Sequence, residues 1–216
     1  MKRKKLFIGV IFLILFTLWT ILIRSVDVKP IGPNNSSVGF STINLFINKL
    51  TGINMIIYNI TDWLGIIPFL IILFFALVGL IQWIERKSIL KVDYSLLILG
   101  IFYLIVLLIF FFFEKITINY RPILINGNLE DSYPSSTTML VTCVIPTAVS
   151  QLRYYIKSKN FRITLFIILY SFAVFMVVAR LISGVHWFTD IIGGILISIG
   201  LVFIYIAFIK ESQLQQ

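Results

Sequence analysis

The chain has 216 residues, of which 59% are hydrophobic and 12% charged, and its formal net charge is +9. A soluble domain of this size carries about twice that charged fraction, and the apolar residues form long runs, so the composition indicates a polytopic membrane protein. The one cysteine, Cys143, excludes an intrachain disulfide and a multi-cysteine metal site, and we expect it to pack inside an apolar run.

In chain order, the apolar runs predict an all-α fold, a six-span transmembrane helical bundle that forms a single membrane domain over residues 1–216. The first run follows the basic cluster Met1–Lys5 and lacks a small-residue cleavage site, so we interpret it as an uncleaved helix. We expect the spans at about 6–23, 65–84, 94–113, 137–152, 163–179 and 191–209, followed by a polar tail, Lys210–Gln216.

Three features interrupt this pattern. Between spans 1 and 2, a turn-rich loop at residues 30–37 precedes scattered apolar residues, which favour a short interfacial helix within residues 38–60. The fourth span is short, and we expect Pro146 to break it. Gly193 and Gly194, near the start of the sixth span, predict that a neighbouring helix approaches closely.

The distribution of basic residues predicts the orientation in the membrane. With six spans, 12 of the 18 lysines and arginines fall on the side of both termini and 6 on the other side. The richer side is expected to be cytoplasmic. Three of the basic residues on the poorer, outer side are Lys115, Arg121 and Arg180, and an anionic ligand is the simplest reason for their position.

The segment from Arg180 to Asp190 holds the only histidine of the chain, His186. Lipid solvates charge poorly, so ionisable residues at the edge of a span usually have a partner or a function. If the segment is helical from about His186, the Asp190 carboxylate shares its face and can orient the imidazole as a nucleophile. Arg180 supplies donors suited to phosphate oxygens.

A second outer loop carries residues of the same chemistry. It contains Lys115 and Arg121, and it ends in Ser135, Ser136 and Thr137 directly before a span. Such a capped helix start presents free backbone N–H groups to an anion. Together the two loops predict a phosphate-handling site with a nucleophile. A metal site is less favoured, because it needs several histidine or acidic ligands and the outer side has one histidine and few carboxylates.

The chain resembles the type 2 phosphatidic acid phosphatase superfamily, which consists of integral-membrane lipid phosphatases with a six-helix core. Arg180, His186 and Asp190 match the spacing of the third motif of that family, with Ala179 in place of its usual serine. Arg121-Pro122 matches the end of the first motif, but Glu114 stands where the motif has lysine, and Lys115 is one residue too close. The second motif, Pro-Ser-Gly-His, here reads Pro134-Ser135-Ser136-Thr137.

The resemblance implies a two-step reaction without a metal or other cofactor. His186 would attack phosphorus and form a phosphohistidine, and Asp190 would orient and charge-balance the imidazole. Arg121, Arg180 and Lys115 would hold the phosphate oxygens, with help from Ser135 and nearby backbone amides. Water would then hydrolyse the intermediate.

Thr137 replaces the histidine that protonates the leaving alcohol in the family, and loss of a general acid costs about 10²- to 10⁴-fold in rate. Three interpretations stay open. The substrate leaving group needs no proton, as with a lipid pyrophosphate. Another group donates, the candidates being Tyr133, Glu130, Asp131, Lys115 and water. Alternatively, the protein binds lipid phosphates but has lost hydrolysis.

We therefore hypothesise hydrolysis of a lipid phosphate or pyrophosphate at the outer face of a bacterial plasma membrane. Candidate substrates are undecaprenyl pyrophosphate, phosphatidylglycerophosphate and phosphatidate. The expected partners are this substrate and membrane lipids, and not nucleic acid. The rival hypotheses are a lipid-phosphate-binding or transport protein and a phosphotransferase.

Overall fold

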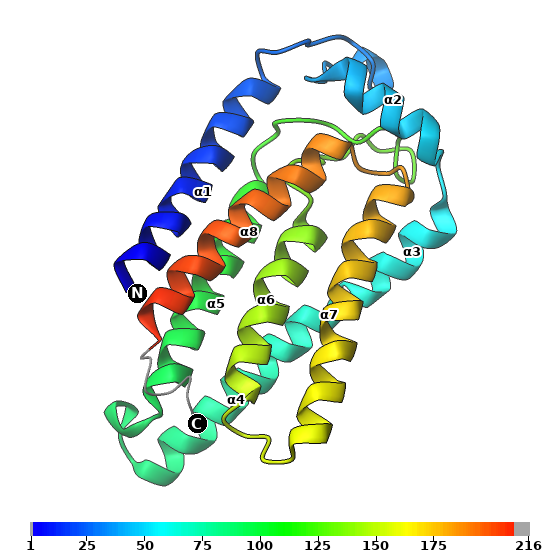
Figure 1. The fold of residues 1–216 in the computed structure, drawn as a ribbon. Coiled ribbons are helices and arrows are strands. Elements are labelled where there is room, and N and C mark those ends of the chain that lie inside the picture. Colours follow the sequence, from blue (N-terminus) through cyan, green and yellow to red (C-terminus); the bar gives the residue numbers. More distant parts are fainter. Residues whose placement is uncertain (1, 210–216) are drawn as a thin grey trace.

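The computed structural model describes residues 2–209, and within them it forms helices, turns and isolated bridges but no strand (Figure 1). The all-helical prediction is confirmed. The predicted tail Lys210–Gln216 lies outside the described residues. The helices are α1 (Lys2–Ile23), α2 (Ser41–Thr51), α3 (Met55–Leu64), α4 (Ile66–Arg86), α5 (Tyr94–Phe113), α6 (Ser136–Leu152), α7 (Lys159–Ile182) and α8 (Phe188–Phe208). Two short 3-10 turns, Pro33–Asn35 and Ile89–Lys91, lie in loops.

Five helical segments within residues 2–209 are long and apolar enough to cross a membrane, namely α1, the joined α3 and α4, α5, α7 and α8. Large apolar side chains are exposed along them, as at Leu104 (64%) and Val174 (62%), and contact with lipid makes such surfaces favourable. The chain is thus a multi-pass membrane protein. The sixth apolar helix, α6, has 17 residues and spans only about 25 Å, so the predicted count of six spans is not confirmed.

The second span was expected at about 65–84, where α4 (Ile66–Arg86) lies, and α3 (Met55–Leu64) extends the same apolar segment on its N-terminal side. One local prediction differs from the structure. Pro146 was expected to break the fourth span, but α6 runs through it. Most of α6 is buried, and this packing outweighs the local cost of a proline.

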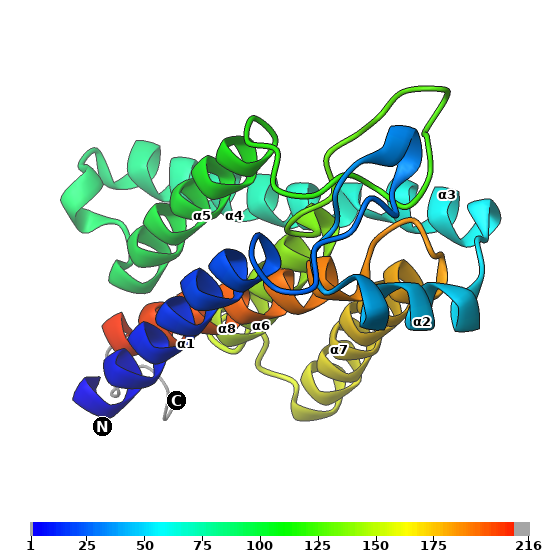
Figure 2. The same cartoon turned by 90° about the horizontal axis from the view of Figure 1, so that it is seen from above.

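Helix α6 lies in the middle of the bundle and packs against α5, α7 and α8, while α1 lies along α8 (Figures 1 and 2). The core consists of apolar side chains from these helices, among them Leu99, Val106, Met139 and Val144. Cys143 is fully buried in this core, as expected. The bundle is therefore organised around a short, buried helix whose N-terminus lies at one end of the molecule.

Three segments meet at that end: α2, the loop between α5 and α6, and the loop between α7 and α8 (Figure 1, upper end). The α5–α6 loop folds back on itself, since Arg121 N–H donates to the Glu130 carbonyl and Ser132 N–H donates to the Asn119 carbonyl. Its turn is Asn126-Gly127, both with positive φ. An Asn-Gly pair is a strong hairpin signal that our sequence interpretation did not use. This fold-back places Arg121 beside residues 130–132.

The two glycines of α8 do allow a close approach. A Cβ atom at Gly193 would lie 2.5 Å from Cε2 of Tyr133, and one at Gly194 would lie 3.0 Å from the Ser135 carbonyl oxygen. The loop and the first turn of α6 therefore pack directly on the α8 backbone.

We predict that Gly193→Ala lowers the thermal unfolding temperature, because the buried Tyr133 ring has to move and overpacking of this kind costs about 1–3 kcal/mol. Gly100→Ala is the matched control, since no atom lies within 4 Å of its new methyl group. Thermal denaturation of both variants in detergent is the measurement, and equal unfolding temperatures would contradict the packing described here.

Candidate functional site

His186 lies in the loop between α7 and α8, two residues before α8, and is 4% exposed. Asp190, fully buried, lies in the first turn of α8, where its Oδ2 accepts from the Trp187 backbone N–H at 2.9 Å. The expectation that His186 and Asp190 share a helical face is wrong, because α8 begins only at Phe188 and His186 precedes it. They meet because Asp190 caps the helix and turns the preceding loop toward itself.

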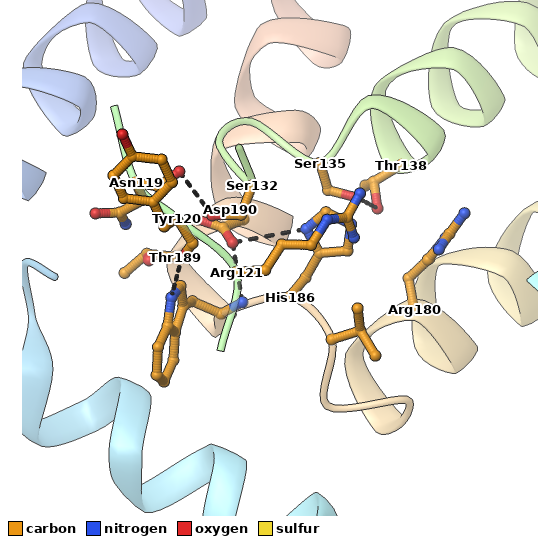
Figure 3. Close-up of polar contacts among 12 residues, drawn as sticks. Asn119, Tyr120, Arg121, Ser132, Ser135, Thr138, Arg180, His186, Thr189 and Asp190 are labelled. Carbon is orange, nitrogen blue, oxygen red and sulfur yellow. Dashed lines mark hydrogen bonds and ion pairs between the residues drawn. The ribbon is translucent and has the colours of Figure 1, made fainter. Parts of the chain in front are cut away.

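Arg121 fixes the chemical form of His186 (Figure 3). Its Nη1 lies 3.1 Å from Nε2 of the imidazole. A guanidinium has donors only, so Nε2 must accept and carries a lone pair, which puts the proton of the neutral ring on Nδ1. Nδ1 lies 3.6 Å from Asp190 Oδ2, slightly beyond hydrogen-bond length. The lone pair of Nε2 thus faces the arginine side of the site, and Nδ1–H faces the carboxylate.

The pKa of His186 lies well below its ordinary value of 6.5. Burial is the largest cause, because an apolar surrounding disfavours the charged ring, and the positive charges of Arg121 and Arg180 add to it. A neutral imidazole with an unprotonated Nε2 is the form required of a nucleophile or base.

Arg180 is held by a partner that the sequence interpretation missed. Its Nη2 donates to Asp62 Oδ1 at 2.9 Å and to Thr137 Oγ1 at 2.8 Å. Its buried Nε and Nη1 have no hydrogen-bond partner among residues 2–209. Unpaired buried donors are costly, so a guanidinium with two free N–H edges is suited to an anion.

Tyr58 connects the two arginines. The guanidinium carbon of Arg180 lies 5.0 Å from the centre of the Tyr58 ring, and that of Arg121 lies 5.7 Å from it. Tyr58 and Asp62 are four residues apart on α3 and point to the same side. Their spacing within an apolar stretch was the signal available in the sequence.

A cavity of about 290 Å³ reaches His186 and Arg121. Its wall combines apolar residues from α5 and α6 with acidic and hydroxyl groups from the α5–α6 loop. The lining residues are Phe110, Phe113, Glu114, Arg121, Leu129, Glu130, Asp131, Ser132, Tyr133, Pro134, Ser136, Met139 and His186. The carboxylate of Glu130 pairs with Arg121 Nε at 3.1 Å.

The residues predicted from sequence are only partly gathered in this cavity. Arg121, Ser136 and His186 line it, with Asp190 directly behind the histidine. Ser135 is buried and donates to Thr138 Oγ1 at 3.0 Å.

The Thr137 hydroxyl accepts a hydrogen bond from Arg180 and does not line the cavity. Lys115 is exposed and also lies outside the cavity lining, whereas its neighbour Glu114 belongs to it. Within residues 2–209, no group of three or more histidine, cysteine or acidic side chains is arranged to hold a metal ion.

Comparison with known proteins gives two findings. The family model described as "PAP2 superfamily" matches residues 100–214, more than half of the chain. A similar solved structure is the first transmembrane PAP2 type phosphatidylglycerolphosphate phosphatase from Bacillus subtilis, with a TM-score of 0.57 and 21% sequence identity. The alignment covers 93% of this chain and 94% of that chain, and it shows a shared fold. A search of curated protein sequences gives no match.

We predict that His186 stays neutral, with its proton on Nδ1, when the pH falls from 7.5 to 6.5. Burial and two arginines hold its pKa below 6.5, so the ring protonates only at lower pH. Because this is the only histidine, its ¹⁵N signals in an NMR titration need no assignment. Arg121→Ala should move the transition to higher pH, whereas Arg3→Ala, at the exposed start of α1, should not. A wild-type midpoint at or above 6.5 would contradict the electrostatics of the site.

Proposed function

Because the chain belongs to the PAP2 superfamily, we propose that it is a lipid phosphatase that hydrolyses a lipid phosphate or lipid pyrophosphate through a phosphohistidine on His186. The candidate substrates are undecaprenyl pyrophosphate, phosphatidylglycerophosphate and phosphatidate. The observation that carries the proposal is the Nε2 lone pair of a buried, neutral His186 in the wall of a cavity that Arg121 also lines, with the charge of Arg180 acting on the same ring.

In the first step, the lone pair of Nε2 forms a bond to phosphorus, and the bond from phosphorus to the leaving oxygen breaks. Arg121 then donates to the phosphate oxygens instead of Nε2, and the free Nε and Nη1 of Arg180 offer further donors. The phosphorylated ring is cationic, and the Asp190 carboxylate behind Nδ1 balances its charge.

In the second step, water attacks phosphorus and the bond to Nε2 breaks. The electron pair returns to the imidazole, inorganic phosphate leaves, and one proton passes to solvent. No resident metal enters either step of this proposal, since two guanidiniums and the first turn of α6 supply the donors.

The walls of the cavity support a lipid substrate. Phe110 and Phe113 line it from α5, and the neighbouring Phe111 and Phe112 are exposed on the lipid-facing side of the same helix. A phosphate head group can enter at Arg121 while its hydrocarbon chain stays along α5 in the bilayer.

The placement of the basic residues supports an extracytoplasmic site and cytoplasmic termini. Lys2–Lys5, Arg86 and Arg153 lie at the end of the bundle opposite the cavity, where α1 begins and α6 ends (Figure 1). The side with more lysine and arginine in its short loops faces the cytoplasm. By this rule the termini face the cytoplasm and the site faces outward, and we propose that the membrane is the bacterial plasma membrane.

Thr137 favours a substrate whose leaving group needs no proton. Its hydroxyl accepts from Arg180, so its role here is to hold a phosphate-binding guanidinium rather than to protonate an alcohol. A lipid pyrophosphate fits this best, since its leaving group is a lipid monophosphate anion.

The contacts also reduce the number of candidate proton donors, because they disfavour Tyr133 and Lys115. The Tyr133 hydroxyl is 2.7 Å from the Thr20 hydroxyl, and burial raises its pKa above the ordinary value of 10. Lys115 lies outside the cavity lining, whereas Glu130 and Asp131 belong to it. If a lipid monophosphate is a substrate, these two carboxyl groups are the candidates.

We predict that His186→Ala abolishes phosphate release while the protein still folds, with a lower unfolding temperature because Arg121 Nη1 loses its acceptor. Brief incubation with a ³²P-labelled substrate should leave acid-labile label on the wild-type protein and none on the variant. A wild-type protein that binds lipid phosphate but never becomes labelled would support the binding or transport alternative instead. A phosphorylated acceptor other than water would indicate a phosphotransferase.

We further predict faster phosphate release from a lipid pyrophosphate than from phosphatidate, with purified protein in detergent. Thr137→His should narrow the difference by raising the rate on phosphatidate. If phosphatidate is hydrolysed equally well by the wild type, a substitute acid acts. Glu130→Gln should then lose about 10²- to 10⁴-fold on the monophosphate alone, with Asp131→Asn as its matched comparison. Equal rates in all four proteins would contradict both explanations.

A further inference from the structure

The short helix α2 has its polar face inside and its apolar face outside. Ser41 and Asn44 are fully buried against the protein, whereas Phe46 is 62% exposed and Leu50 is 70% exposed. An amphipathic helix in water has the reverse arrangement. The exposed apolar face therefore indicates that lipid, and not water, lies outside α2.

The polar face of α2 contacts the residues after His186. Asn44 Nδ2 donates to Thr189 Oγ1 at 3.0 Å, and the Thr189 backbone N–H donates to Asn44 Oδ1 at 3.2 Å. The Nδ2 and Oδ1 atoms of Asn44 thus both form hydrogen bonds with Thr189 of α8. The first turn of α8, which holds Asp190, is fastened to α2 in this way.

The same region contacts the residues before His186. Asn48 Nδ2 donates to the Gly184 carbonyl at 3.0 Å, and the Asn54 backbone N–H donates to the Ser183 carbonyl at 2.9 Å. Gly184 has φ +65°, and a Cβ atom there would lie 1.8 Å from the Gly52 carbonyl oxygen. No other residue fits this position without moving the backbone.

We propose that α2 is a membrane-interface helix whose asparagine face positions the His186 loop, with Asn44 and Asn48 as positioning residues. This proposal rests on the proposed function, because it assigns these residues to the turnover of His186. The partner of the outer face is the bilayer interface. Helix α2 spans only about 16 Å, lies at the end of the bundle, and connects two membrane-spanning helices (Figure 2).

The consequence is that lipid contact supports the geometry of the nucleophile. When α2 is fixed in the interface, its asparagines hold the loop both before and after His186. Trp187 Nε1 also donates to the Tyr120 carbonyl at 2.7 Å, which ties the same loop to the α5–α6 loop. A loop released from α2 keeps its chemical groups but loses their alignment, and a displacement of about 1 Å can cost about 10²-fold in rate.

The first experiment compares Asn44→Ala and Asn48→Ala with Asn59→Ala, a matched control at an exposed position of α3. We expect kcat to fall by about 10- to 100-fold for the first two, with KM close to wild type. The unfolding temperature should fall for Asn44→Ala, whose side chain is fully buried and hydrogen-bonded, and stay close to wild type for Asn48→Ala. The His186 NMR signals should split or broaden in the same two variants. Asn48→Ala removes only one hydrogen bond to the loop, so this variant alone can test the positioning role if Asn44→Ala does not fold. Unchanged kcat and unchanged His186 signals in Asn48→Ala would overturn the positioning role.

The second experiment tests the outer face. Cys143 is fully buried, so Phe46→Cys can be labelled with a nitroxide at the new site alone. In vesicles of phosphatidylglycerol and phosphatidylethanolamine, we expect the label to be accessible to oxygen and protected from a water-soluble nickel chelate. Asn128→Cys, at the exposed hairpin tip, is the control with the opposite pattern. Exposure of the Phe46→Cys label to nickel would overturn the lipid contact.

These readouts separate the two proposals. If wild-type protein forms no phosphohistidine, the proposed function fails, but the NMR signals of His186 and the label on α2 still report positioning and lipid contact. If wild-type protein turns over and neither asparagine variant changes kcat or the NMR signals, only the inference about α2 fails.

Discussion

The arrangement at the site depends on one partly buried contact, the hydrogen bond from Arg121 Nη1 to Nε2 of His186. A guanidinium beside an imidazole is compatible with burial only if the ring is neutral and offers a lone pair. The contact thereby selects the tautomer of His186 and directs its Nδ1–H toward Asp190. It also holds the Arg121 guanidinium at the place where an anion would bind. The α5–α6 hairpin and the capped start of α8 both serve to bring these two residues together.

The second arginine is stabilised in a different way. Arg180 has a carboxylate partner in Asp62 on α3 and stacks on Tyr58, which also adjoins Arg121. Two guanidiniums within a few ångströms of one ring repel each other, and the carboxylates of Asp62 and Glu130 offset this repulsion. The site therefore keeps its cations in position without a ligand and retains free N–H groups for one.

The departure at Thr137 fits this electrostatic picture. A histidine is missing where the family has one, and the threonine hydroxyl instead fixes Arg180. In the proposed reaction, Thr137 therefore contributes to phosphate binding through Arg180, and the proton donor has to be sought in the substrate or in the carboxyl groups on the cavity wall. Within the fold, the polar face of α2 supplies a further constraint on the same loop.

Composition and periodicity by themselves determined the all-helical membrane class and the apolar helices, because lipid requires long runs that satisfy their own backbone hydrogen bonds. Local spacing identified His186, Asp190, Arg121 and Arg180, because charges beside apolar runs are rare and need a reason. Tertiary structure alone decided that Tyr58 and Asp62 belong to the site, that Lys115 lies outside the cavity, and that α6 continues through Pro146. These outcomes depend on packing between segments far apart in the chain, and no local pattern reports which side chains such packing brings within hydrogen-bond distance.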